Sequence, residues 1–470
     1  MQKNRIVCSM FLAVVLELLC SRLSAGQSAT APAPPRYPLP TYDEDWRHLG
    51  RGDKSDDPWN PVKFIPISGD GSSSFLSLGG EARATYERFG NQDFGLSTPS
   101  PDGYLLQRYL FHADVHPTER VRVWTEINSS FEAGRVGGPR SVLDKNVLDL
   151  HQAFIDAQLY SSRTDSVSIR AGRQEIAFGS GRMYSLREGP NVPFSFDGVR
   201  LKVQRSLWRL DGWAARPVIN RNGVFDDGSH RQFEVWGAYA SHFPARSGNV
   251  GVDVYYLGID RLHARFDQGI NDETRHTVGA RAWRVGKWGY DTEAMYQFGR
   301  FGAGDIRAWR AVANASRTWS SLRWDGIVDV ASGDKDRSNP DLQTFNALFQ
   351  SGTYSGRAQL LGPNNSIRLE PTLTVNPAAT VIVSAGWGFY WRQSVHDGLY
   401  GIAGNLVVPS NGAPGRFEGS RPTVQVDWQV SRHLSAHVNY IYVFNGQFEE
   451  MSVHGTPTMS FISPWVTYRF

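Results

Sequence analysis

Residues 172–203 read GRQEIAFGSGRMYSLREGPNVPFSFDGVRLKV, and this stretch decides the fold. Apolar and polar residues alternate up to Gly172, and the alternation resumes from Asp197 to Val203. This pattern predicts two strands, each with one apolar face, joined by a long loop rich in Gly and Arg. The polar faces carry Arg170, Arg200 and Lys202. Charged side chains opposite apolar ones are typical of a membrane barrel, whose wall meets hydrocarbon on one side and water on the other.

The same two-residue period recurs from Phe75 almost to the end of the chain. It predicts eighteen strands, near 75–88, 104–116, 120–130, 149–160, 166–175, 197–205, 207–216, 231–242, 249–260, 275–284, 287–299, 306–316, 320–331, 366–375, 379–392, 420–429, 433–444 and 458–469. Connections after odd-numbered strands are predicted to be long, and 261–274 is one of them; 300–305 is the one short exception. Connections after even-numbered strands are tight turns. Long loops on one rim and short turns on the other predict an all-β, antiparallel transmembrane barrel of about eighteen strands.

The N-terminus reads as an export signal over residues 1–25, with Lys3 and Arg5 before an apolar stretch and a small-residue cleavage site at Ala25. A membrane anchor or a lipoprotein start at Cys20 is the alternative, but the apolar stretch is short. Residues 26–74 are predicted as a Pro-rich linker and a periplasmic segment that packs beneath the barrel, and 75–470 as the barrel. Both cysteines lie in the signal, which excludes disulfides and thiolate metal sites from the mature chain.

Composition supports an outer-membrane protein. Aromatic residues make up 12% of the chain, glycine occurs 47 times, and the net charge of +3 gives no reason to expect a nucleic-acid partner. Only seven of the 49 basic residues are lysines. Arginine binds carboxylates through two parallel hydrogen bonds and stays charged when partly desolvated. A GC-rich genome would explain the same bias without any functional cause.

Several motifs carry a resemblance to a known family. They are LGGEARATYE (78–87), RAGRQEIAFGSGRM (170–183), SLREGPNVPFSFDGVRL (185–201), ASGDKD (331–336), TFNALFQSGTYSG (344–356), LLGPNN (360–365) and FYWRQSVHDGLY (389–400). In this order and spacing they are similar to the bacterial alginate export family, from about residue 42 to the C-terminus. The resemblance implies a monomeric eighteen-stranded barrel in the bacterial outer membrane, with an arginine-lined pore for an anionic polyuronate. Terminal Phe470 resembles the signal that barrel proteins present to their assembly machinery, and a periplasmic export complex is a further expected partner.

The candidate site is an electropositive lumen, because rings of basic side chains in a pore attract anions. The predicted pore-lining residues are Arg83, Arg108, Arg170, Arg182, Arg187, Arg200, Lys202, Arg281, Arg368 and Arg392, and the carboxylates predicted to hold them are Asp156, Glu188, Asp197 and Glu293. Alternatively, Arg and Asp pair across neighbouring strands and simply fill a polar lumen. The loop 176–196 is expected to fold into the pore, and the loop 332–365 to act as a lid.

Two other functions remain open. A general or substrate-specific porin for small anions, sugars or aromatic acids would show the same strand pattern. An outer-membrane hydrolase would need a serine and histidine dyad, and no lipase-like motif surrounds a serine here. The prediction is therefore a channel without catalytic residues, cofactor or metal.

Overall fold

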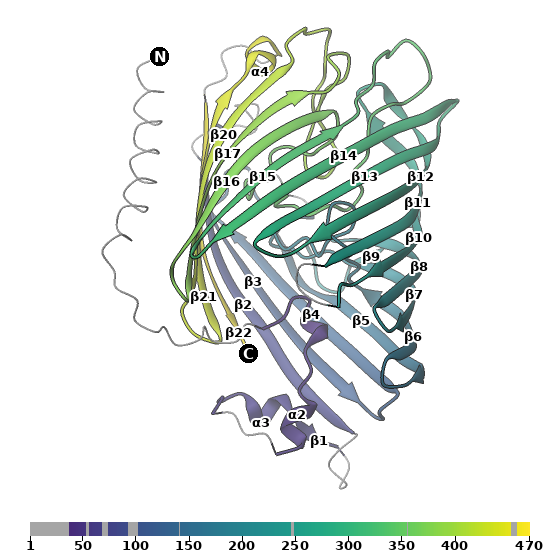
Figure 1. Ribbon diagram of the computed structural model, residues 1–470, viewed down its shortest axis with the longest axis vertical. Helices are drawn as coiled ribbons and strands as arrows, with labels where there is room; N and C mark the ends of the chain where they lie inside the picture. Colours follow the sequence, from purple (N-terminus) through teal and green to yellow (C-terminus); the bar gives the residue numbers. More distant parts are fainter. Residues whose placement is uncertain are drawn as a thin grey trace.

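The computed structural model describes residues 37–52, 56–67, 74–92, 102–140, 142–245, 249–354, 356–452 and 458–470. Within these residues, eighteen long antiparallel strands form one closed barrel (Figure 1). Closure is made by the first and last of them, where Ala82 lies opposite Tyr468 and Ala84 opposite Val466. Pairing the two edge strands leaves no open edge, which a sheet in hydrocarbon requires. The predicted export signal and residues 26–36 of the Pro-rich linker lie outside the described residues.

The wall strands differ from the predicted ranges mainly at their ends. They are β2 (Phe75–Gly90), β3 (Asp102–His116), β4 (Val121–Ala133), β5 (Asn146–Ser161), β6 (Asp165–Gln174), β7 (Phe196–Arg205), β8 (Trp208–Ile219), β10 (Phe233–His242), β11 (Val250–Phe266), β12 (Gly269–Arg284), β13 (Trp288–Phe301), β14 (Gly304–Trp319), β15 (Leu322–Ala331), β16 (Ser366–Ala378), β17 (Val381–Arg392), β20 (Phe417–Gln429), β21 (Leu434–Asn445) and β22 (Met459–Arg469). The predicted all-β antiparallel barrel is therefore confirmed.

Shorter elements lie outside the wall. They are η1 (Thr41–Asp43), α2 (Arg47–Gly50), α3 (Asn60–Lys63), α4 (Gln447–Ser452), β1 (Ile65–Pro66), β9 (Gly228–Ser229), β18 (Leu399–Tyr400) and β19 (Leu406–Val408). In the part of the chain that the structure describes, no helix is long and apolar enough to cross a membrane. Helices α2 and α3 and strand β1 lie below the barrel, at the end where the C-terminus lies (Figure 1).

One predicted loop is wrong. The long connection expected at 261–274 is a tight hairpin, because β11 continues to Phe266 and β12 begins at Gly269. The pairing shifts between Arg261 and Ala264, so the apolar and polar residues fall out of step there. A bulge of this kind breaks the two-residue period from which the strand end was predicted.

The two faces of the wall have opposite chemistry. Along β7, Val199 and Leu201 are exposed on the outer face, whereas the Arg200 side chain between them is buried. The apolar core is enclosed by the barrel: Tyr184, Phe196, Phe345 and Phe349, from two loops and the start of β7, are all buried. The interior is thus filled by folded loops as well as by wall side chains.

Candidate functional site

Buried ion pairs cover much of the inner wall. Arg108 donates to Glu81 at 2.9 Å, Arg200 donates to Asp211 at 2.9 Å, and Arg310 donates to Asp329 at 2.8 Å. In each pair both side chains are nearly inaccessible. Because cross-strand register places each carboxylate beside its arginine, the charges of these guanidinium groups are neutralised within the wall. They support the barrel and offer little free charge to a solute.

Two long loops fold inward and pack on one another. The first, 175–195, is held to the wall by Arg83, whose guanidinium donates to the backbone carbonyls of Glu188 and Pro190, each at 2.9 Å. The second, 332–365, meets the first through an isolated bridge between Tyr184 and Phe349. The prediction that the 176–196 loop enters the barrel is confirmed by these contacts.

Two adjoining cavities follow the wall formed by β16, β17 and β20 to β22. The periplasmic cavity has a volume of about 440 Å³ and includes Tyr37, Arg432 and Arg469 in its lining. The mid-barrel cavity has a volume of about 410 Å³ and includes Arg368 and Glu370. Because they share lining residues, the two cavities together are called the polar track, which passes beside both inward loops. Five arginines and three carboxylates line it: Arg83, Arg357, Arg368, Arg432, Arg469, Glu188, Glu370 and Asp427.

The two cavities share Glu188, Arg357 and Trp465, and this set is called the junction. Glu188, from the 175–195 loop, accepts from Arg108 at 3.0 Å and lies 3.9 Å from Arg83. Arg357, from the 332–365 loop, lies over the Trp465 ring at 3.7 Å and donates to Ser463 at 3.4 Å. Among the described residues Arg357 has no carboxylate within 4 Å, so its charge is not neutralised by contact. The junction is therefore where solute would meet free positive charge.

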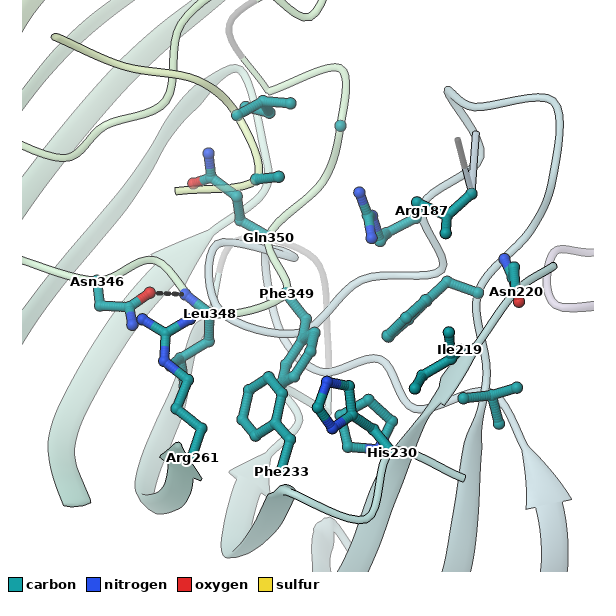
Figure 2. A pocket seen from close by; sticks show the side chains of 17 residues that line it. Arg187, Ile219, Asn220, His230, Phe233, Arg261, Asn346, Leu348, Phe349 and Gln350 are labelled. Carbon is teal, nitrogen blue, oxygen red and sulfur yellow. Dashed lines mark hydrogen bonds between the residues drawn. The ribbon is translucent and has the colours of Figure 1, made fainter. Parts of the chain in front are cut away.

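A third cavity, called the outer pocket, lies at the opposite end of the barrel interior from the periplasmic cavity. It has a volume of about 260 Å³. Arg187 enters from one side and Gln350 stands on the other, with Phe233, Phe349 and His230 below them (Figure 2). Its lining includes residues from both inward loops and from the wall, and it contains no carboxylate among the described residues.

A family model described as alginate export matches residues 74–459. The chain belongs to the alginate export family. No curated protein sequence matches it. Similar solved structures are outer-membrane porins: a BenF-like porin from Pseudomonas fluorescens Pf-5 (TM-score 0.59, 9% identity, covering 84% of this chain and 98% of that one) and OpdK from Pseudomonas aeruginosa, solved with vanillate (TM-score 0.55, 11% identity, 84% and 98%). OccK2 (OpdF) from Pseudomonas aeruginosa is similar too (TM-score 0.56, 10% identity, 84% and 97%).

At these identities the porins show the fold. Together with the family match they establish this alginate export family member as a channel-forming barrel of the bacterial outer membrane. Family and fold indicate a transport porin rather than an enzyme.

The predicted pore residues of this family member occupy different environments. Arg83 and Arg368 line the track and Arg187 lines the outer pocket. Arg170 and Lys202 both contact Asp156, and Arg281 donates to Asp253 and Asp291. Arg182 donates to Asp291 and Glu293, while Arg108 and Arg200 belong to the buried wall pairs. Whether any of them touches solute stays a prediction.

Two predicted site residues have other partners. Arg392 donates to the backbone carbonyls of Val395, Asp397, Ala413 and Gly415 and lies over Phe448, so it ties extracellular loops together. Asp197 was expected to hold a pore arginine. It accepts instead from Arg173, at 2.8 Å. Position 197 follows Phe196, which faces the interior, so alternation turns Asp197 to the outer face.

Sequence reasoning found Glu188 of the junction but missed Arg357 and Trp465. Arg357 lies in a loop, and its place beside Trp465 depends on how the 332–365 loop packs, which no local period records. Trp465 itself could have been found, because alternation along β22 puts it on the face opposite to Val466, which is exposed. Two further aromatic residues, Tyr104 and Tyr239, are buried inside the barrel, where their hydroxyls donate to Glu87 and Asp253.

Proposed function

We propose that this channel passes an anionic carbohydrate of the polyuronate class along the polar track. The observation that carries the proposal is Arg357, a guanidinium without an ion-pair partner among the described residues, at the junction of two cavities. Each sugar ring carries a carboxylate, and this carboxylate would move from one arginine to the next along a track lined by five arginines. Exchange between several weak sites permits conduction, whereas one tight site would block it.

Two features support an anionic solute. The lining of the track holds more arginines than carboxylates, and guanidinium groups bind carboxylates through directed hydrogen bonds. Family membership points the same way, because the family model is described as alginate export.

Planar-bilayer recordings of the purified full-length protein test the proposal. With a salt gradient, the reversal potential should show anion preference, and oligomers of mannuronate added to one side should reduce the current. Replacing Arg357 by Gln should weaken both effects, because it removes the free charge at the junction. The control is Arg300→Gln, since Arg300 is 65% exposed and lies at the end of β13, away from the track.

The outcomes separate the alternatives. Anion preference without block by oligomers would favour a porin for small anions over a polyuronate channel. Cation preference in the wild-type channel would overturn the proposal, even with the barrel intact.

A further inference from the structure

The outer pocket is chemically unlike the polar track. Its walls are dominated by apolar side chains, with Phe194, Phe233 and Phe349 among them. The Phe349 ring lies 5.6 Å from each of the other two rings, and both pairs are close to parallel. Val142 at its edge is 41% exposed, so the pocket opens to solvent on that side. The three rings form a surface that suits a flat ring.

Several polar groups in the lining have no hydrogen-bond partner among the described residues. Gln350 is 2% exposed, yet its amide nitrogen is unpaired, and Nδ1 of His230 is unpaired as well. The Arg187 guanidinium has no ion pair or side-chain hydrogen bond in the described parts of the chain; its contact is with the Phe194 ring, at 5.2 Å. Unpaired buried donors are costly, and native proteins keep few of them. Two such buried polar atoms, in Gln350 and His230, lie in the same lining as the half-buried Arg187 guanidinium, and this guanidinium points to a ligand with acceptor atoms.

The backbone is held in an uncommon conformation at two lining residues. Arg187 has φ of 54° and Leu348 has φ of 52°, both in the left-handed region. Side chains other than Gly, Asn and Asp rarely adopt this conformation, and it persists where the surrounding structure enforces it, often at binding sites. One of the two residues comes from each inward loop, so the pocket is formed by strained segments that meet.

We propose that the outer pocket binds one small aromatic carboxylate, with its ring on Phe233 and Phe349 and its carboxylate on Arg187. The pocket volume of about 260 Å³ suits a single substituted ring. Gln350 lines the pocket on the side opposite to Arg187 (Figure 2). A monosaccharide uronate fits poorly, because its several hydroxyls would be desolvated against phenylalanine and aliphatic side chains.

The ligand would contact the 175–195 loop through Arg187, the 332–365 loop through Phe349 and the barrel wall through Phe233. It would therefore tie both inward loops to the wall at the extracellular mouth. The site does not depend on which solute the polar track passes, because the two linings have no residue in common.

Equilibrium binding of benzoate to the full-length protein in detergent micelles, measured by calorimetry, tests the proposal. Wild-type protein should bind one benzoate per chain. The variant Arg187→Met keeps the length of the side chain and removes the charge, and should bind about tenfold more weakly or worse, the loss expected for a charge-assisted hydrogen bond. Phe233→Leu should also weaken binding. Arg221→Met, on an exposed extracellular loop outside the lining, should bind as wild type does.

Two other probes decide the ligand class. Benzyl alcohol, which has the ring without the charge, should bind much more weakly than benzoate, and glucuronate should not displace benzoate. Equal binding of benzyl alcohol, unchanged binding by Arg187→Met, or tighter binding of glucuronate would each overturn the proposal. Arg357→Gln should leave benzoate binding unchanged, so failure here is distinguishable from failure of the polyuronate track.

Discussion

Glu188 controls the charge at the junction. It is the carboxylate of the 175–195 loop that reaches Arg108 and Arg83, and its side chain is 37% exposed while theirs are buried. Arg108 already has a second carboxylate, Glu81, whereas the hydrogen bonds of Arg83 go to backbone carbonyls. Glu188 therefore reduces the positive field that an anion meets at the junction.

Replacing Glu188 by Gln should increase anion preference. The amide keeps the size of the side chain and removes one negative charge from the junction, which leaves Arg83 and Arg357 less compensated. The expected result is a shift of the reversal potential in the direction opposite to that of Arg357→Gln. Glu234→Gln is a suitable control, because Glu234 is exposed on β10 and pairs with Arg216. An unchanged or smaller anion preference would show that Glu188 does not act on the permeating ion.

Asp227 gives one extracellular loop a pH dependence. Burial, followed by the nearby charge of Asp149, raises the pKa of Asp227 to about 6. Carboxylate oxygens of Asp149, Asp226 and Asp227 lie within 4.8 Å of one another. Because its pKa in the folded loop is above the ordinary value near 4, Asp227 binds a proton more tightly when folded. The loop should lose stability as the pH rises from about 4 to 6.

Limited proteolysis of residues 220–228 measures this effect. Cleavage should be slower at pH 5 than at pH 7.5 after correction for the activity of the protease. In Asp227→Asn the difference should be much smaller, because the amide does not titrate and can still accept from the Arg221 backbone nitrogen. A pH dependence that survives the substitution would assign it to another group.

The N-terminal segment closes part of the periplasmic mouth. Tyr42 of η1 is buried inside the barrel, edge-on to Trp124 at 6.4 Å and to Phe154 at 5.9 Å. The guanidinium of Arg170 lies over its ring at 4.6 Å. Below it, Trp59 packs on Phe470 at 4.2 Å. The segment is anchored to the wall by aromatic contacts, and it covers the inner face of β4 to β6.

Tyr42→Ala should release this segment. Removing a large buried ring costs about 3–5 kcal/mol, and here the loss falls on the docking of residues 37–52 rather than on the barrel. We expect faster proteolysis of the segment and a larger single-channel conductance, with unchanged resistance of the barrel to unfolding in SDS. Tyr86→Ala, on the outer face of β2, is the control. If conductance stays the same while the segment is cleaved, the segment does not obstruct the channel.

The wall strands could be predicted because each has one lipid-facing side, so the alternation is enforced along its length. Beyond the bilayer both faces of a strand meet water, and that constraint ends. β11 and β12 illustrate the limit. The alternation breaks around Leu262 and His263, so the continuation of β11 to Phe266 is not predicted from the sequence. Partners were harder to predict than strands. Alternation places Arg200 on the inner face, but its partner Asp211 follows from the pairing of β7 with β8, and that relation depends on register.

The whole molecule is a cylinder with hydrocarbon outside, and inside it a wall of mostly neutralised charged side chains surrounds an apolar core. Its stability in the membrane therefore depends on keeping charge on one face of each strand. Lys202 faces the interior near Asp156, at 3.4 Å, and its neighbour Leu201 is exposed on the outer face. These adjacent residues are a matched pair for testing the assignment of the two faces.

Leu201→Arg should impair assembly, because a guanidinium on the lipid-facing side costs about 2–4 kcal/mol near the bilayer midplane. Lys202→Gln should assemble normally, because position 202 does not face lipid and Asp156 keeps Arg170 as a partner. The fraction of folded protein in outer-membrane preparations, read from the mobility of unheated and heated samples in SDS gels, measures both. Normal assembly of Leu201→Arg together with failure of Lys202→Gln would mean that the two faces are assigned the wrong way round, and the arginines of the track would then face lipid.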